Sequence, residues 1–180
     1  MASRPHFTRP AAALASGILF VLSGCSKGDG LSDYDRMKNA QKEAAESLTE
    51  KGAKLKETHF AQGSAWAVNL SGMEISDDLL RQVKQLGRVS ELDLSRSTVT
   101  DDQLGLITQL GIATLVLKFD LSNTGITDAG LERLEHLAVL TQMNLAGTKV
   151  TPAGVERFKK QRKDDTTVQP FAKNPTIRLK

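Results

Sequence analysis

The sequence predicts an α/β fold, a short solenoid of stacked strand–turn–helix units with a helical cap at its N-terminal end. Four self-similar segments between residues 65 and 161 predict the stacked units, and an Ala-, Lys- and Glu-rich stretch before them predicts the cap. The chain has 180 residues, of which 39% are hydrophobic and 25% are charged. These values are typical of one soluble domain and argue against a disordered chain or a polytopic membrane protein.

Residues 1–24 have the organisation of a secretory signal peptide. A basic segment without acidic residues precedes an apolar stretch, residues 11–22. That stretch is too short for a spanning helix, which needs about 20 residues. The tetrapeptide Leu22-Ser23-Gly24-Cys25 resembles the bacterial lipobox. The resemblance implies cleavage before Cys25 and attachment of lipid, including palmitate, to this residue. An ordinary secreted protein with a free thiol and an uncleaved anchor are the alternatives.

Removal of the signal peptide changes the charge of the chain. The formal net charge is +3, and loss of Arg4 and Arg9 with the signal leaves +1. A nucleic-acid partner therefore loses its main support and is not predicted. The lone cysteine, Cys25, excludes an internal disulfide framework and any Cys-based zinc or iron–sulfur site. Residues 25–31 are predicted to be the lipidated cysteine and a tether, and the six residues after the cysteine span at most about 20 Å.

Residues 32–64 are predicted to form an N-terminal helix and cap. Ser32 is placed to accept backbone N–H groups at the helix start, with Asp35 three residues later, and Gly52 is placed to end the helix. An apolar stripe at helical spacing predicts that one face packs on the following residues, and a coiled coil or a membrane-surface helix is the alternative. His59 falls in a predicted loop. The stripe contains Tyr34, Met37, Gln41, Ala44 and Leu48.

Residues 65–161 repeat one pattern about four times. The copies align on Leu70, Leu94, Leu121 and Leu145, at intervals of 24, 27 and 24 residues, and the residue two positions earlier is apolar in every copy. This pair has the period of a strand, while later apolar positions have helical spacing. Because one such unit cannot bury its apolar side alone, the copies are predicted to stack. The predicted helix N-caps are Ser76, Thr100, Thr127 and Thr151.

The repeated motif resembles that of a known family. Residues 120–134, DLSNTGITDAGLERL, resemble the ribonuclease-inhibitor-like and F-box-type leucine-rich repeats of secreted bacterial lipoproteins. The lead-in ESLTEKGAKL, followed by AWAVNLSG, resembles the helix-plus-strand cap of that family. The resemblance implies a leucine-rich-repeat solenoid over residues 65–161, with parallel strands on its concave face and helices on its convex face. The motif gives almost no information about function.

Three features depart from a regular repeat. The Asn expected three residues after the aligned leucine is replaced by hydroxyl residues in three copies and by Met73 in the first copy, whose turn is therefore predicted to be looser. Three extra residues between Leu110 and Leu121 predict a bulge or a longer loop. Residues 162–180 are predicted to be a C-terminal cap or tail, in which the alternation of TIRLK (176–180) predicts an edge strand.

Motifs for catalysis are missing from the sequence. It contains no nucleotide-binding glycine loop, no HExxH, no GxSxG and no EF-hand loop, so neither an enzyme, a cofactor nor a metal is predicted. His59 and His136 are interpreted as solvated surface histidines. A basic run near the last predicted helix is interpreted as a solvated helix end, with binding to anionic lipid as the alternative. The run consists of Lys159, Lys160, Arg162 and Lys163.

The best candidate for a binding surface is the outward face of the predicted strands. Because neighbouring strands lie about 4.8 Å apart, Asp93 and Asp120 are expected to face each other, with Asn69 and Asn144 beside them. Two such close carboxylates are expected to raise at least one pKa or to recruit a cation. The surface is either a shallow acidic patch for a basic peptide, an amine or a divalent ion, or an ordinary feature of the repeat. The candidate binding residues are Glu91, Asp93, Lys118, Asp120, Gln142 and Asn144.

The predicted function is non-catalytic binding of a protein or peptide at the bacterial cell envelope. The domain is expected in the periplasm or at the cell surface, as a monomer attached to a membrane through Cys25. The outer membrane is favoured because Ser26, rather than an aspartate, follows the cysteine. A structural envelope lipoprotein that self-associates is the first alternative, and a metal-dependent enzyme is the second.

Overall fold

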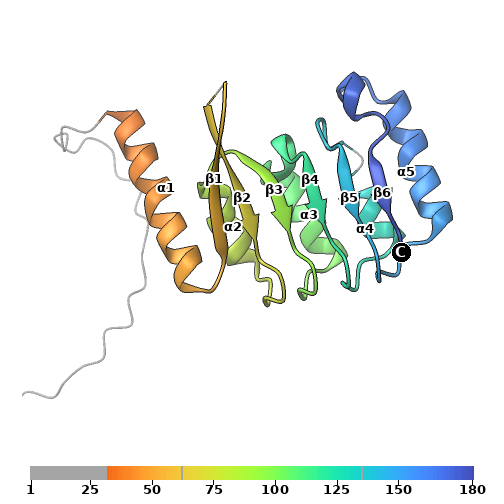
Figure 1. Cartoon of the computed structure of the whole chain (residues 1–180), viewed down its shortest axis with the longest axis horizontal. Coiled ribbons are helices and arrows are strands. Elements are labelled where there is room, and N and C mark those ends of the chain that lie inside the picture. Colours follow the sequence, from red (N-terminus) through yellow and green to blue (C-terminus); the bar gives the residue numbers. More distant parts are fainter. Residues whose placement is uncertain (1–31, 62, 135) are drawn as a thin grey trace, which may run out of the picture. The chain divides into compact units, whose positions relative to one another are not determined.

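Six strands in chain order make one sheet in the computed structural model, and helices lie along one face of it (Figure 1). The structure describes residues 32–61, 63–134 and 136–180. The first two strands are antiparallel, and all later neighbours are parallel. The prediction of an α/β fold is confirmed. The predicted signal peptide (1–24) and the lipidated cysteine with its tether (25–31) lie outside the described residues.

Helices and strands alternate along most of the described residues. None of these helices combines the length and the hydrophobicity that crossing a bilayer requires. The strands are β1 (Lys54–Phe60), β2 (Gly63–Asn69), β3 (Val89–Asp93), β4 (Lys118–Asp120), β5 (Gln142–Asn144) and β6 (Thr176–Arg178). The helices are α1 (Asp33–Glu50), α2 (Asp77–Gln85), α3 (Asp101–Gln109), α4 (Asp128–Glu132) and α5 (Pro152–Asp164), with short 3₁₀ helices η1 (Ile112–Leu115) and η2 (Pro170–Ala172).

The middle row of the sheet faces the helices and supplies much of the core. Val68, Leu92, Phe119 and Met143 are register partners on successive strands, and each is only 2% exposed. Phe119 lies opposite Leu92 as the sequence alignment predicts, so the extra residues before β4 leave the register unchanged. They belong to a longer loop that contains η1. The predicted edge strand in 176–180 is confirmed as β6, which pairs parallel to β5.

Helix α1 begins and ends as predicted but is only partly packed. Ser32 is its N-cap and forms a capping box with Asp35, and Gly52 follows the helix with a φ of +98°. In the predicted apolar stripe, Ala44 and Leu48 are buried. Tyr34 is 62% exposed and Met37 is 50% exposed, because the first half of the helix borders an open groove rather than the core. The expectation that the whole stripe packs is therefore wrong for its first half.

His59 lies in strand β1, so the prediction of a loop there is wrong. Its ring Nδ1 lies 2.8 Å from the hydroxyl of Ser64 across the β1–β2 hairpin. The sequence pattern does not indicate this strand, because its two large apolar residues, Leu55 and Phe60, are five positions apart and do not alternate. The hairpin extends the parallel sheet by one antiparallel strand.

The turns after β3, β4 and β5 are closed by the hydroxyl residues that replace Asn. Ser97, Thr124 and Thr148 each donate to the carbonyl of the preceding aligned leucine, at 2.6, 2.6 and 2.7 Å. Met73 has no hydroxyl, and here the next segment supplies one. The backbone N–H of Ile75 donates to the hydroxyl of Thr98 at 3.0 Å. The turn after β2 is thus stabilised by a hydrogen bond to the neighbouring segment, where the other copies use a hydroxyl of their own.

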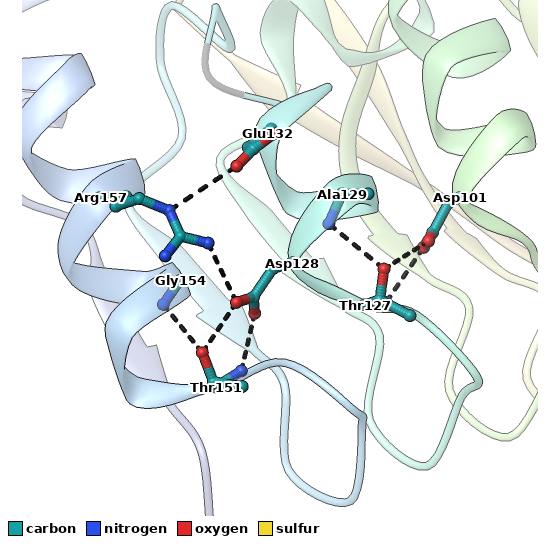
Figure 2. A network of polar contacts seen from close by, with 8 residues as sticks. All are labelled: Asp101, Thr127, Asp128, Ala129, Glu132, Thr151, Gly154 and Arg157. Carbon is teal, nitrogen blue, oxygen red and sulfur yellow. Dashed lines mark hydrogen bonds and ion pairs between the residues drawn. The ribbon is translucent and has the colours of Figure 1, made fainter.

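Hydrogen bonds also connect the helix starts of successive segments. All four predicted N-caps accept a backbone N–H group at the start of α2, α3, α4 and α5. Figure 2 shows that the carboxylate of Asp101 accepts both the N–H (3.0 Å) and the hydroxyl (2.6 Å) of Thr127. The carboxylate of Asp128 accepts the same two groups of Thr151, each at 2.7 Å. We call these two Asp–Thr pairs the cap ladder.

The cap ladder affects the charge of its second carboxylate. Hydrogen bonds from the backbone and then the hydroxyl of Thr151 hold the pKa of Asp128 below its ordinary value. Arg157, whose Nη2 donates to the same carboxylate at 3.1 Å, lowers it further. Asp128 therefore stays ionised at neutral pH and remains an acceptor for the next helix start.

Arg162 is fully buried, and its assignment to a solvated helix end is wrong. Val155, Phe158 and Arg162 have helical spacing and form the buried face of α5. The guanidinium of Arg162 donates to the carbonyl of Ala172 at 2.8 Å and lies 5.3 Å from the ring centre of Phe158. Burial lowers the pKa of Arg162 to about 10, and the charge of Asp165 opposes this shift. The group therefore remains protonated at neutral pH.

Candidate functional site

Two rows of side chains cover the face of the sheet opposite the helices. The residues of each row are register partners across all six strands. Both rows line one groove of about 590 Å³, and all six candidate residues from the sequence lie in it. Row one contains Lys56, Ala67, Glu91, Lys118, Gln142 and Thr176. Row two contains Lys54, Asn69, Asp93, Asp120, Asn144 and Arg178.

The centre of row two has the arrangement that the sequence predicts. Asp93 and Asp120 are direct register partners on β3 and β4. The side-chain amide of Asn69 donates to Oδ2 of Asp93 at 2.9 Å, and that of Asn144 donates to Oδ2 of Asp120 at 3.0 Å. Each carboxylate is therefore held in position by an amide from its other neighbouring strand.

The second oxygen of each carboxylate has a structural role. Oδ1 of Asp93 accepts the backbone N–H of Ser95 at 2.9 Å, and Oδ1 of Asp120 accepts that of Ser122 at 2.8 Å. Hydrogen bonds of this kind, from a side chain to the backbone two residues on, stabilise turns. The side-chain oxygens of Asn69 and Asn144 make the same contact with Ser71 and Ala146. Row two thus closes the turns after β2, β3, β4 and β5. This is the role expected if these residues are an ordinary feature of the repeat.

The pKa of Asp120 is lowered, which is opposite to the expectation for a like-charged pair. Partial burial of the carboxylate acts to raise this pKa. Hydrogen bonds from the side chain and backbone of Ser122 and from Asn144, together with the charge of Arg178, outweigh that effect. At Asp120 the pKa is therefore not raised, because fixed donors on neighbouring residues stabilise the ionised form.

Substituting Asn144 with alanine is expected to raise the pKa of Asp120 toward its ordinary value, because one of the donors to the carboxylate is lost. The carboxyl carbon of Asp120 can be followed by NMR during an acid titration. Gln142→Ala, two residues earlier on β5 in row one, is the control and is expected to leave the pKa unchanged. An equal pKa in the wild type and Asn144→Ala would contradict the assigned role of the amide.

The lowered pKa also fixes the direction of a stability change. The ordinary value is 3.8, and the pKa of Asp120 in the folded chain lies below it. The ionised carboxylate therefore contributes stability above pH 3.8, and this contribution is lost as the pH falls through the folded pKa. The hydrogen bonds of row two are accordingly a source of acid sensitivity.

Row one carries an ion pair at its centre. Nζ of Lys118 lies 2.7 Å from Oε1 of Glu91, and both side chains are about half exposed, at 53% and 44%. Exposed pairs of this kind contribute little to stability, typically about 0–1 kcal/mol. The pair balances its own charges, so the negative charge of the groove centre comes from Asp93 and Asp120, and the charge of Arg178 partly offsets it at Asp120.

Basic residues at both ends of the groove were missed by the sequence reasoning. Lys54 and Lys56 belong to β1, and Arg178 belongs to β6. The charge of Arg178 is felt by Asp120. The groove therefore has an acidic centre, as one of the two expected alternatives has it, but also basic ends, about 24 Å apart across six strands. The alternation in KLK and TIRLK was the only signal for these residues.

The remaining candidate residues lie apart from the groove. His59 contacts Ser64, and Nδ1 of His136 lies 2.8 Å from Oδ2 of Asp165. In the part of the chain that the structure describes, no three His, Cys, Asp or Glu side chains gather where they could hold a metal ion. Cys25 lies outside this part. The prediction that the chain is not an enzyme stays a prediction.

These residues define the chain as an α/β protein with a six-stranded, mostly parallel sheet and a polar groove on its exposed face. No family model matches the sequence, and no curated protein matches it. Among solved structures, the chain is similar to leiomodin-1 actin-binding site 2, with 13% identity and a TM-score of 0.49. The match covers 84% of this chain and 82% of that chain. A likeness at this level carries no argument about function.

Proposed function

We propose that residues 65–161 form a short leucine-rich-repeat solenoid between an N-terminal helical cap and a C-terminal strand. Burial and recurring hydrogen bonds support this proposal. The aligned leucines Leu70, Leu94, Leu121 and Leu145 are at most 1% exposed. The cap ladder and the row-two turns recur at the same positions in successive copies. Each copy supplies one strand and one helix, so a row of strands and a row of helices follow from stacking alone.

We propose that the protein is a non-catalytic binding module, attached to the bacterial cell envelope through a lipid on Cys25. Its groove binds a protein or peptide segment that carries a basic side chain. One observation indicates a basic ligand: two adjacent carboxylates, Asp93 and Asp120, are held by amides at the centre of an open groove. Among the described residues neither takes part in a salt bridge within 4.0 Å. A partner's Lys or Arg would supply the missing cation, with charge-assisted hydrogen bonds.

The experiment uses isosteric neutral variants of the two carboxylates. Asn69 and Asn144 occupy the same position in other copies and make the same turn, so Asp93→Asn and Asp120→Asn keep the turns while removing both charges. A capped peptide of alternating serine and arginine is titrated calorimetrically into residues 25–180. Its affinity is expected to fall about tenfold in the double variant, because two favourable charge interactions of about 0.5–1 kcal/mol each are lost.

The controls separate recognition from general electrostatics. A peptide of alternating serine and glutamate is expected to bind more weakly than the arginine peptide. Gln142→Ala, which changes the groove without changing its charge, is expected to leave the affinity for the arginine peptide within about twofold. Binding of the arginine peptide that is absent, or equal in the wild type and the double variant, would exclude the groove centre as the site.

A further inference from the structure

The large hydrophobic side chains that the described residues expose are confined to one edge of the fold. This edge is where strands β2 to β6 begin, and we call it the strand-start edge. Phe60 is the register partner of Gly63, the first residue of β2. Leu115 ends η1, shortly before β4, and Phe171 lies in η2, shortly before β6. The exposed hydrophobic residues are Tyr34, Met37, Phe60, Leu115 and Phe171.

Helix α1 begins at the same edge. Tyr34 and Met37, in its first two turns, line a groove of about 690 Å³ together with Gly63 and Trp66 of β2 and Arg88. Arg88 immediately precedes β3. In Figure 1 the start of α1, the end of β1 and η2 all lie along the upper edge of the sheet, with α1 at its left end and η2 at its right end. The described chain therefore starts at the edge that carries its exposed hydrophobic side chains.

The two edges of the fold differ in their exposed hydrophobic side chains more than in their charge. At the opposite edge, the first turns of α2, α3 and α4 carry acidic residues such as Asp77, Asp102 and Asp128, and Arg178 ends β6 there. The strand-start edge carries Arg88 beside the α1 groove, and Lys163 lies in the last turn of α5. Cations and aromatic side chains together are the composition that binds at the interface of an anionic membrane.

Several acidic residues also lie at the strand-start edge, and they are engaged locally. Asp33 pairs with Arg36 at 3.5 Å, and Asp35 belongs to the capping box of Ser32. Asp165 accepts from Thr167, at 2.7 Å from both its N–H and its hydroxyl. Of these contacts, the ion pair with Arg36 neutralises charge, while the hydrogen bonds hold the other two carboxylates in place.

We propose that the strand-start edge docks on the surface of the membrane to which Cys25 is attached. The inference rests on the proposed lipid anchor. Residues 26–31 span at most about 20 Å, so an anchored Cys25 holds the start of α1 close to the bilayer. At such a high effective concentration, weak insertion of Tyr34, Met37 and Phe60 suffices for docking.

The distribution of the hydrophobic residues favours a flat partner. Phe60 and Phe171 lie near opposite ends of the six-stranded sheet, which is about 24 Å wide. A bilayer interface meets side chains spread along such an edge at once, whereas a peptide or a single helix would cover only the α1 groove. Docking through this edge leaves the rows of the exposed sheet face open to a partner, because those rows lie on a face and not on an edge.

The test uses the single cysteine and the single tryptophan of the chain. Residues 32–180 form one compact unit, and residues 25–180 contain this unit together with Cys25. The Cys25 thiol is coupled to maleimide lipids in vesicles of phosphatidylcholine and phosphatidylglycerol. In a Trp66→Phe background, Phe60→Trp reports on the strand-start edge. Lys149→Trp, in the loop before α5, reports on the opposite edge. Brominated phosphatidylcholine is expected to quench the reporter at position 60 and to leave that at position 149 unquenched.

A second pair of variants tests the side chains themselves. Tyr34→Ser with Met37→Ser is expected to abolish most of the quenching at position 60, whereas Glu74→Ser with Asp78→Ser, on the opposite edge, is expected to leave it unchanged. Circular dichroism confirms that each variant is folded. Absent quenching at position 60, or equal quenching at positions 60 and 149, would overturn the proposal. Because the anchor is chemical, either result is independent of natural lipidation and of peptide binding in the groove.

Discussion

Arg162→Met is expected to lower the free energy of unfolding by about 2–3 kcal/mol, because a buried carbonyl that loses its donor costs about 1–3 kcal/mol. The guanidinium donates to the carbonyl of Ala172 at 2.8 Å and lies 3.5 Å from that of Leu140. Methionine fills most of the space of the arginine stem but donates nothing. The contact joins α5 to η2, the segment that leads into β6, so the C-terminal strand should be destabilised first.

Urea denaturation and hydrogen exchange measure the two parts of this expectation. Lys160→Met and Lys163→Met are matched controls, because both residues are exposed on the same helix. Surface substitutions of this kind change stability by about 0.5 kcal/mol or less. Amide exchange in residues 172–178 is expected to accelerate in Arg162→Met alone. A stability equal to that of the lysine controls would show that the buried guanidinium contributes nothing.

The helical stripe of α5 could have identified Arg162 from the sequence. Val155 and Phe158 are apolar columns of the repeat, and Arg162 follows them at the spacing of the same helix face. The surrounding lysines favour a solvated helix end, whereas the helical periodicity favours burial, which is what the structure has. The carbonyl that receives the guanidinium belongs to η2, and no sequence pattern marks that segment as its partner.

The repeat made most of the fold predictable. The aligned leucines, the helix N-caps and the register across the insertion before β4 all follow from side chains that recur at fixed spacing. The hairpin partner β1 has no such recurrence, and its charged residues Lys54 and Lys56 were therefore missed at the end of the groove. The exposure of the first half of α1 was not predictable, because periodicity shows which residues share a helix face but not how much of that face other elements cover.

At the groove, residue positions were predictable and their electrostatics were not. The alternation of the strands places Asp93 beside Asp120 and amides on either side. The direction of the pKa shift depends on donors that reach the carboxylate, among them Ser122 two residues further on and Arg178 from a strand outside the repeat. Such contacts depend on turn geometry and on the C-terminal strand, neither of which the spacing of leucines specifies.

Gly154→Ala is expected to destabilise the chain by about 1–3 kcal/mol, as overpacking of a well-filled site does. A methyl group at this position would meet the carboxylate of Asp128, with Oδ2 only 2.7 Å away. Asp128 would have to move and lose its two hydrogen bonds to Thr151 (Figure 2). The sign is diagnostic, because alanine in a helix is ordinarily about 1 kcal/mol more favourable than glycine.

A double-mutant cycle with Asp128→Ala isolates the cause. Once the carboxylate is gone, Gly154→Ala has space for its methyl group and is expected to become neutral or stabilising, so the two substitutions should be strongly non-additive. Gly125→Ala is the matched control, because a methyl group there meets no atom within 4 Å, and a gain of about 0.4–1 kcal/mol is expected. Additive effects of Gly154→Ala and Asp128→Ala would show that the glycine is not required by the cap ladder. A double variant that is destabilised by less than the sum of the two single effects would mean that the Asp of one segment dictates the Gly of the next, and contacts between copies would then maintain the sequence repeat.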